Sequence, residues 1–393
     1  MPPLPDELVE EIFLRLPLDE PAALLRASLV SKPCFGVLTG PGFCGRYREL
    51  HGTPPMLGFL YSRPDGSGDD DEDPAMLFVS TSKFWVRFPD FTESTHHRLD
   101  AWDCRHGRVL LRDNDNYPMM LVVWDPLTGC AWELYGPDGG ADSYEIAVLC
   151  AMSGCDQRAC HAAPFKVVYV RVDNSEEGEC VAHACVLSLD TSDWGNPRPY
   201  FWYEWKEPCP GLGLAAADAF IRPMPSVLVN DALHFLLGYR YEDDRVGILK
   251  YSLSSDSLSL IDAPIAESVA VHAPILMAMK DGSMGFAHVD RLTLYAWSRQ
   301  IDSNGVVSWI NYRLVDLKNL LPIKNPKITP RLIGSVEGGD IIFVNTDLGI
   351  YEIDLKTLEW KARLRRENLH SLIPYMSFYN PLGITMSFFF YDS

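Results

Sequence analysis

Apolar side chains recur at helical spacing in the first fifty residues. Between Pro5 and Pro17 they lie three or four positions apart, which places them in one stripe along a helix. Asp6 and Glu7 lie in its first turn, where the helix dipole favours negative charge. Pro17 is expected to end the helix. The stripe consists of Leu8, Val9, Ile12, Phe13 and Leu16.

Two further short helices are expected before residue 53. One begins behind Asp19 and ends at Pro33, and another covers Pro41 to Leu50. Three helices of this length bury only a thin core, so part of their apolar surface needs a partner. We expect this excess to form a docking face for helices of another protein. The residues expected to form it are Leu4, Pro5, Leu8, Ile12, Leu16, Leu25 and Val30.

From Met76 onward the pattern changes to short β-strands separated by turn residues. One unit recurs: a strand, a turn begun by Asp or Ser, and a second strand opened by an aromatic residue or Leu. The units lie roughly 45–65 residues apart, the size of a four-stranded propeller blade. Examples are 121–129 leading to Trp132, 184–191 leading to Trp194, and 349–357 leading to Trp360.

These units predict a mainly β, propeller-like domain over residues 53–393, behind a helical unit at 1–52. We expect about six four-stranded blades of kelch-like size, although the double glycine of kelch repeats occurs convincingly only at Gly338-Gly339. Residues 55–100 are expected to supply the sixth blade, closed by a strand at Ile384–Tyr391. Closure by a terminal strand would remove an exposed sheet edge. Residues 62–75, with five consecutive acids from Asp69, are expected to be a flexible loop.

The N-terminal pattern resembles an F-box. The resemblance rests on Leu4-Pro5-Asp6-Glu7-Leu8, Ile12, Leu16-Pro17, Ala27-Ser28-Leu29-Val30-Ser31-Lys32, Phe43 and Tyr47. The family usually has Trp two residues after the lysine, where Cys34 stands here. Phe35 can fill that space by a one-residue shift; otherwise adaptor binding is weaker. The resemblance implies docking on a Skp-type adaptor and, through it, on cullin and RING subunits.

The β-region resembles the C-terminal domain of grass F-box proteins. The similarity lies in Gly107–Leu111, Trp124–Gly129 and Pro374–Tyr379. It implies a substrate-recognition subunit of an SCF-type (Skp-cullin-F-box) E3 ubiquitin ligase, which recruits an unknown target protein and is not itself an enzyme. The alternatives are a propeller lectin or enzyme with a degenerate F-box, and a non-degradative scaffold.

The net charge and the length of the apolar runs argue against two classes of partner, nucleic acids and membranes. The formal net charge of -19 repels phosphate backbones, so no nucleic-acid partner is expected. No secretory signal and no apolar run long enough to span a bilayer occurs, so no membrane partner is expected. These features and the resemblance predict a protein of the cytoplasm and/or nucleus.

Few residue patterns suggest chemistry, and no cofactor is expected. Cys150, Cys155, Cys160 and His161 could hold zinc, but the four-residue gaps favour an ordinary loop with partly buried thiols. The polar groups near His96 and His97, including Asp100, Asp103 and His106, are expected at the surface. Catalytic motifs of hydrolases, P-loop proteins and zinc proteases are missing. Aromatic residues including Tyr200, Trp202 and Trp205 could form a recognition surface or pack between blades.

Overall fold

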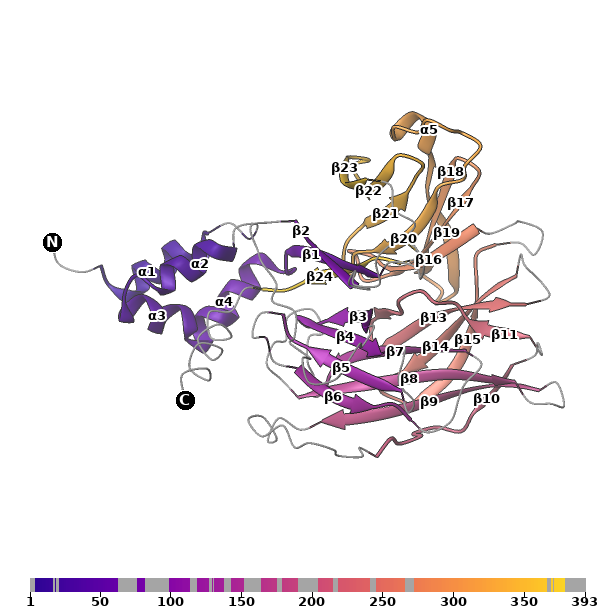
Figure 1. The fold of residues 1–393 in the computed structure, drawn as a ribbon, viewed down its shortest axis with the longest axis horizontal. Coiled ribbons are helices and arrows are strands. Elements are labelled where there is room, and N and C mark those ends of the chain that lie inside the picture. Colours follow the sequence, from indigo (N-terminus) through magenta and orange to yellow (C-terminus); the bar gives the residue numbers. More distant parts are fainter. Residues whose placement is uncertain are drawn as a thin grey trace, which may run out of the picture.

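The computed structural model places a helical region beside a ring of β-sheets (Figure 1). It describes residues 4–16, 18, 21–62, 76–81, 99–113, 119–126, 129, 131–137, 143–151, 164–174, 179–189, 204–214, 218–240, 245–265, 272–365, 369 and 371–378.

The described part of the helical region contains four helices, so the expected number of three is corrected. They are α1 (Asp6–Leu14), α2 (Pro21–Ser28), α3 (Lys32–Thr39) and α4 (Pro41–His51). Pro33 does not end the second helix but lies in the first turn of α3. Ser31 is the N-cap of α3, and its hydroxyl accepts a hydrogen bond from the Cys34 N–H at 3.3 Å. Proline suits this position because the first helical N–H groups have no partner within the helix.

The helices share a hydrophobic core with the β-region. Leu14, Leu38 and Tyr47 are buried in the same cluster as Leu57 of the first strand. The Tyr47 ring contacts the edge of Phe378, which follows the last described strand, at a centroid distance of 6.2 Å. This packing fixes α4 against the ring of sheets.

The described strands of the β-region form six sheets. The first sheet, which we call the closing sheet, contains β2 (Met76–Ser80), β1 (Met56–Ser62) and β24 (Ile373–Met376). The second sheet contains β3 (Leu99–Arg105), β4 (Arg108–Asp113), β5 (Met120–Trp124) and β6 (Ala131–Tyr135). The third contains β7 (Ser143–Cys150), β8 (Phe165–Asn174), β9 (Cys180–Leu189) and β10 (Leu212–Leu214). The fourth is β11 (Ala219–Ile221), β12 (Val227–Val229), β13 (Ala232–Tyr239), β14 (Val246–Ser252) and β15 (Ser257–Asp262). The fifth sheet contains β16 (His272–Ala278), β17 (Met284–Asp290), β18 (Thr293–Ile301) and β19 (Val307–Asp316). The sixth contains β20 (Arg331–Ser335), β21 (Ile341–Asn345), β22 (Gly349–Asp354) and β23 (Trp360–Arg365). The short helix α5 (Leu317–Leu320) lies between these two sheets in the sequence.

The innermost strands of the six sheets contact one another in a closed circle. In order, β24 contacts β3, β3 contacts β7, β7 contacts β11, β12 contacts β16, β16 contacts β20, and β20 returns to β24. This is a six-bladed propeller, which confirms the predicted fold class.

The ring is closed by pairing the chain's first strand with its last described one. In this antiparallel pair Phe59 is opposite Pro374 and Leu60 is opposite Ile373. The expected closing strand at Ile384–Tyr391 lies outside the described residues, and Ile373–Met376 takes the position assigned to it. Proline is tolerated in β24 because this strand is at the inner edge of its sheet.

The inner strand of the fourth sheet is split in two. Both β11 and β12 pair with β13, and Arg222-Pro223-Met224-Pro225-Ser226 separates them. Prolines cannot donate hydrogen bonds to a neighbouring strand, so this segment leaves the ladder. The break lies at the central channel and helps to form the site described next.

Candidate functional site

The first candidate site is an exposed apolar stripe at the start of the helical region. Leu4, Leu8 and Ile12 have exposed fractions of 58%, 52% and 51%. Residues four positions apart lie on the same face of a helix, so Leu8 and Ile12 point in one direction. On other faces of α1, Leu14 is buried, and Glu10 and Glu11 form ion pairs with Arg46 of α4. Contacts within the helical region therefore orient the apolar stripe outward.

The other predicted docking residues are placed differently. Val30, in the turn after α2, is 77% exposed, and Pro5 is exposed directly before α1. Leu16 is half-buried and packs against the core that the helices share with the propeller. The side chain of Leu25 lies outside the described residues. Cys34 and Phe35, both on α3, are half-buried.

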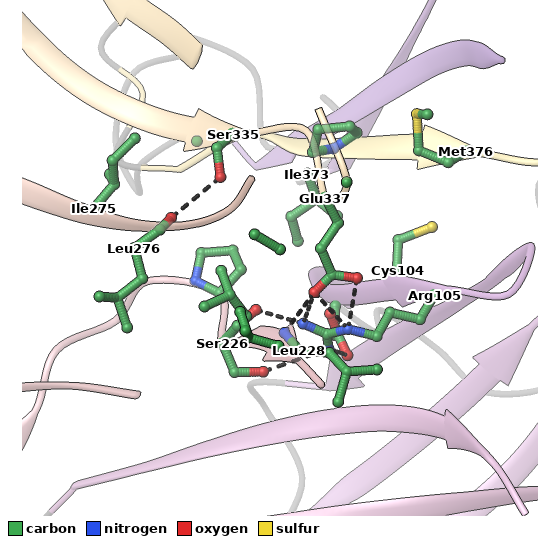
Figure 2. A pocket seen from close by; sticks show the side chains of 18 of the residues that line it. Cys104, Arg105, Ser226, Leu228, Ile275, Leu276, Ser335, Glu337, Ile373 and Met376 are labelled. Atoms are coloured by element: carbon green, nitrogen blue, oxygen red, sulfur yellow. Dashed lines mark hydrogen bonds and ion pairs between the residues drawn. The ribbon is translucent and has the colours of Figure 1, made fainter. Parts of the chain in front are cut away.

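The second candidate site is a cavity of about 320 Å³ at one end of the propeller channel (Figure 2). Its wall comes from the ends of β3, β16, β20 and β24 and from the break between β11 and β12. Thr53 and Pro54, which connect α4 to β1, also line it. Most of its surface is apolar, with Met224, Leu228 and Ile275 among the lining residues. We call it the channel cavity.

An ion-pair network lies at one side of the channel cavity (Figure 2). Arg105 donates to Glu337 Oε1 through Nη2 at 2.7 Å and through Nε at 3.0 Å. Its Nη1 donates to Asp103 Oδ2 at 2.5 Å, and its Nη2 also donates to the Ser226 carbonyl at 2.5 Å. That carbonyl is available because the proline-containing break has removed Ser226 from the β-ladder.

Two backbone groups complete the network. The Leu228 N–H donates to Glu337 Oε1 at 2.8 Å, and the Val148 N–H donates to Asp103 Oδ2 at 2.8 Å. Side chains or backbone from four sheets thus meet around one guanidinium group. The Arg105 side chain is only 4% exposed, whereas that of Glu337 is 32% exposed. Glu337 is therefore the member of the network that a ligand in the cavity would contact most readily.

Burial controls ionisation in this network. It raises the pKa of Asp103 to about 6, although Arg105 acts in the opposite direction. Burial disfavours the charged form of Arg105 too, but Asp103 and Glu337 outweigh it and the pKa of Arg105 is raised. Burial also raises the pKa of Cys104, so this lining thiol stays protonated at neutral pH. The described lining groups suit binding of an apolar group better than attack on a substrate.

Sequence reasoning missed this network. Asp103 was expected at the surface, but it is only 3% exposed. The error arose because Asp100 and Asp103 interrupt the apolar pattern of β3, which hid the strand. Arg105 and Glu337 carry no local signal, since only closure of the ring brings them together. His96 and His97 lie outside the described residues.

The candidate aromatic residues are only partly described. Trp205 is half-buried: its indole N–H donates to the Tyr135 carbonyl at 2.8 Å, and its ring contacts the edge of Tyr169. These contacts join two neighbouring blades. Tyr200 and Trp202 lie outside the described residues.

The candidate metal ligands are also only partly described. Cys150 is buried at the end of β7, whereas Cys155, Cys160 and His161 lie outside the described residues. Within the part of the chain that the structure describes, no group of three Cys, His, Asp or Glu side chains could hold a metal ion. The described helices likewise include none with the length and apolar character needed to cross a membrane.

Comparison with known proteins identifies the helical region. The family model of the F-box domain matches residues 2–38, so the chain carries an F-box domain at its N-terminus. This match covers α1, α2 and most of α3. A comparison with curated proteins finds no match.

Several solved structures have a similar chain trace. The luciferin-regenerating enzyme is 9% identical with a TM-score of 0.37, covering 71% of this chain and 78% of that chain. TolB from Acinetobacter baumannii is 12% identical with a TM-score of 0.41, covering 88% and 73%. The SapL1 lectin in complex with alpha methyl fucoside is 7% identical with a TM-score of 0.39, covering 80% and 98%. These likenesses assign no activity to the chain.

Proposed function

We propose that this protein is the substrate-recognition subunit of an SCF-type E3 ubiquitin ligase. The observation that carries the proposal is the outward-facing stripe of Leu4, Leu8 and Ile12 within a matched F-box domain. Such a subunit binds a Skp-type adaptor, which connects it to cullin and RING subunits. The protein would perform no covalent chemistry itself.

The exposed stripe supplies a physical reason for adaptor binding. Leaving three large apolar side chains about half exposed costs free energy in water, and a partner's surface can recover it. Full burial of one such side chain is worth roughly 1.5–3 kcal/mol, so covering three half-exposed ones contributes several kcal/mol in total. Val30 would extend the same docking surface, and the half-buried Leu16 would support it from the core side.

The propeller would recruit the target protein. Target lysines would then be held near the ubiquitin-conjugating enzyme, which raises their effective concentration without any new chemistry. The shared core around Tyr47 and Phe378 supports this function, because it fixes the adaptor-binding helices relative to the target-binding surface. We further propose that the chain is related to the plant F-box proteins with kelch-like propellers and acts in the cytoplasm and/or nucleus.

Replacing Ile12 tests the docking face. Ile12→Asp would place a charge in the apolar contact, so we expect co-purification with a Skp-type adaptor to be lost. Leu314→Asp is the matched control, because Leu314 is a 63% exposed apolar residue on β19 of the propeller. It should leave adaptor binding intact. Unchanged adaptor binding by Ile12→Asp, with the chain still folded, would refute the proposed face.

Capture of the intact complex tests the ligase function. The full chain should bring down cullin and RING subunits together with the adaptor. With ligase activity blocked, it should also retain a ubiquitinated target. Association with the adaptor alone, without a cullin, would instead indicate a non-degradative scaffold.

A further inference from the structure

Exposed cations gather at one end of the last two blades. In an antiparallel four-stranded sheet, the start of the first strand, the turn between the second and third strands and the end of the fourth strand lie together. In the sheets β16–β19 and β20–β23 this end carries the cations, and the segment that joins the two sheets adds more. We call the cluster the distal basic face. It consists of Arg291, Lys318, Lys324, Lys327, Arg331 and Arg365, all of them exposed.

The strand register and two turns hold this cluster together. Arg331 is opposite Asn345 in the β20–β21 pair, and Arg365 is opposite Gly349 in the β22–β23 pair, so both flank the β21–β22 turn. The N–H of Leu317, the first residue of α5, donates to the Leu292 carbonyl in the β17–β18 turn at 2.9 Å. This hydrogen bond places α5 beside the turn that carries Arg291.

The distal basic face lies at the end of the propeller opposite the F-box domain. The Gly338 N–H, just after β20, donates to the carbonyl of Ala278, which ends β16, at 2.9 Å. Both residues line the channel cavity together with Thr53 and Pro54, which lead from the F-box domain into β1. The cations lie at the other end of the same two sheets. Figure 1 correspondingly shows α5 well apart from α1–α4.

Positive charge exceeds negative charge at this end. The carboxylates there are those of Asp290, Asp316 and Asp347. Asp316 accepts hydrogen bonds from the Lys318 N–H at 2.9 Å and from the Asn319 amide at 2.8 Å, not from an ammonium group. Arg331 apart, no side chain of the distal basic face forms an ion pair within the described part of the chain. In a chain with a net charge of -19, this concentration of unneutralised cations indicates an anionic partner.

Two large apolar side chains protrude among the cations. Ile328 is 37% exposed in the loop after α5, and Leu348 is 42% exposed in the β21–β22 turn. Asp347 joins the loop to the turn, because its Oδ2 accepts from the Lys324 N–H at 3.1 Å and from the Asn325 N–H at 2.6 Å. The Ile328 N–H donates to the Asn325 carbonyl at 3.1 Å, which tightens the loop. The two apolar side chains are thus presented from a fixed pair of turns.

We propose that the distal basic face binds the surface of an anionic lipid bilayer. Such a surface attracts Lys and Arg side chains, while apolar side chains beside them enter the boundary between headgroups and acyl chains. The face supplies both kinds of group at the exposed end of two blades. Acidic residues elsewhere in the chain oppose this attraction little, because charges more than about 10 Å away are screened at physiological ionic strength.

This inference goes beyond the proposed function, since it concerns where the protein binds in the cell and not which target it recruits. It would replace the expectation of no membrane partner, which rested on spanning segments and on the net charge of the whole chain. A surface contact needs only a local excess of cations with apolar side chains beside them. Bound in this way, the propeller would hold the F-box domain on the side away from the bilayer.

The chemistry of the face favours a bilayer over a nucleic acid. Single-stranded nucleic acids are bound by cations together with aromatic side chains on which the bases stack. Among the described residues at this end, which are 290–292, 316–331, 345–349 and 364–365, none is aromatic. Ile328 and Leu348 suit acyl chains and offer nothing to a base or a phosphate.

Co-sedimentation of the purified full chain with vesicles tests the proposal. The probes are vesicles of phosphatidylcholine alone and vesicles of equal parts phosphatidylcholine and phosphatidylserine. We expect the mixed vesicles to bind at least about tenfold more tightly, because several cations gain from the anionic surface. Added salt should weaken this binding. Equal binding to both kinds of vesicle, or binding to neither, would overturn the proposal.

Paired charge variants locate the contact. Lys324→Gln combined with Lys327→Gln should weaken binding to the mixed vesicles by about tenfold, because two cations leave the face. The matched control is Lys280→Gln combined with Lys356→Gln. These two exposed lysines belong to the same blades but lie in the β16–β17 and β22–β23 turns, at the channel-cavity end. Equal binding by the two double variants would contradict the assignment to this face.

Replacing Ile328 distinguishes a bilayer from a soluble anion. Ile328→Ser keeps every charge but removes an apolar side chain, so it should weaken vesicle binding by about fivefold. Soluble polyglutamate, inorganic phosphate and single-stranded RNA serve as competitors and should displace the vesicles poorly. Wild-type vesicle binding by Ile328→Ser, or efficient displacement by any competitor, would overturn the bilayer in favour of a soluble anionic ligand. The assay contains no adaptor, so its outcome is independent of the Ile12→Asp experiment.

Discussion

Arg105 and Glu337 form an ion pair with an Nη2–Oε1 distance of 2.7 Å, although 232 positions separate them in the sequence. Arg105 ends β3 in the first complete blade, and Glu337 follows β20 in the last one. The closing sheet lies between these two blades around the ring. The pair therefore bridges the region where the two ends of the propeller meet.

Replacing Glu337 should destabilise the propeller. Glu337→Ala would remove one of two carboxylates from a nearly inaccessible guanidinium group and leave the Leu228 N–H without its acceptor. Breaking an ion pair with a buried partner typically costs several kcal/mol, and Glu337 is partly exposed, so we expect a loss of about 3 kcal/mol. Urea denaturation of the full chain measures it.

The control for this experiment replaces an exposed glutamate of the same blade. Glu359 lies in the exposed turn before β23, so Glu359→Ala should change the unfolding midpoint little. A similar, small effect of both variants would mean that Arg105 is held adequately by Asp103 and Ser226 alone.

Closure of the ring also depends on a glycine. A Cβ atom on Gly334 of β20 would lie 2.4 Å from the carbonyl oxygen of Leu372, just before β24. The Leu372 N–H donates to the Ile333 carbonyl at 2.7 Å, so the backbone there cannot easily move away. Gly334→Ala should therefore lower the stability by about 1–3 kcal/mol, the usual cost of overpacking. Faster proteolysis near the closing sheet should accompany this loss.

Replacing a second glycine, Gly36, should not destabilise the protein. A Cβ on Gly36 would meet nothing within 4 Å, and this residue is exposed on α3. Alanine favours a helix over glycine by about 1 kcal/mol, so Gly36→Ala should leave thermal stability unchanged or slightly raised. Equal behaviour of the two alanine variants would show that β20 and Leu372 separate without cost.

The sequence predicted the strands in the middle of the blades better than those at the centre of the ring. The predicted segments 121–129 and 349–357 begin close to β5 and β22, which lie in the middle of their sheets. Inner strands such as β3 and β16 were not predicted because their apolar pattern is interrupted. In β3, Asp103 and Arg105 interrupt the apolar pattern, and in β16 a proline does so. Such residues make sense only once all six blades are assembled.

The two candidate sites differ in the same way. The apolar stripe on α1 could be predicted from sequence because residues at helical spacing are close together in the chain. The exposure of Leu8 and Ile12 follows from that local pattern. The groups of the network beside the channel cavity come from four sheets, and Arg105 and Glu337 have no shared motif. Their proximity depends on how several blades pack around the ring, which periodicity does not encode.

The buried imidazole of His234 should make stability depend on pH. Its pKa is about 4 in the folded protein against 6.5 ordinarily, because burial, Lys250 and Arg299 disfavour the charged form. Between these values the unfolded chain binds the proton more readily. The free energy of unfolding therefore has its full contribution from His234 above pH 6.5 and loses it as the pH falls toward 4. The raised pKa of Asp103, about 6, acts in the opposite sense, so the effect must be isolated by substitution.

The variant His234→Gln isolates the contribution of His234 to the pH dependence of stability. The variant lacks the titrating group, so its stability should fall less than that of the wild type between pH 7 and pH 5, by about 2 kcal/mol. Thermal unfolding of the full chain at both pH values measures the difference. Ser259→Ala, at an exposed position in the same sheet, should keep the wild-type dependence. If His234→Gln keeps it as well, the pKa of His234 in the folded protein must lie close to its ordinary value, and burial does not disfavour its charged form.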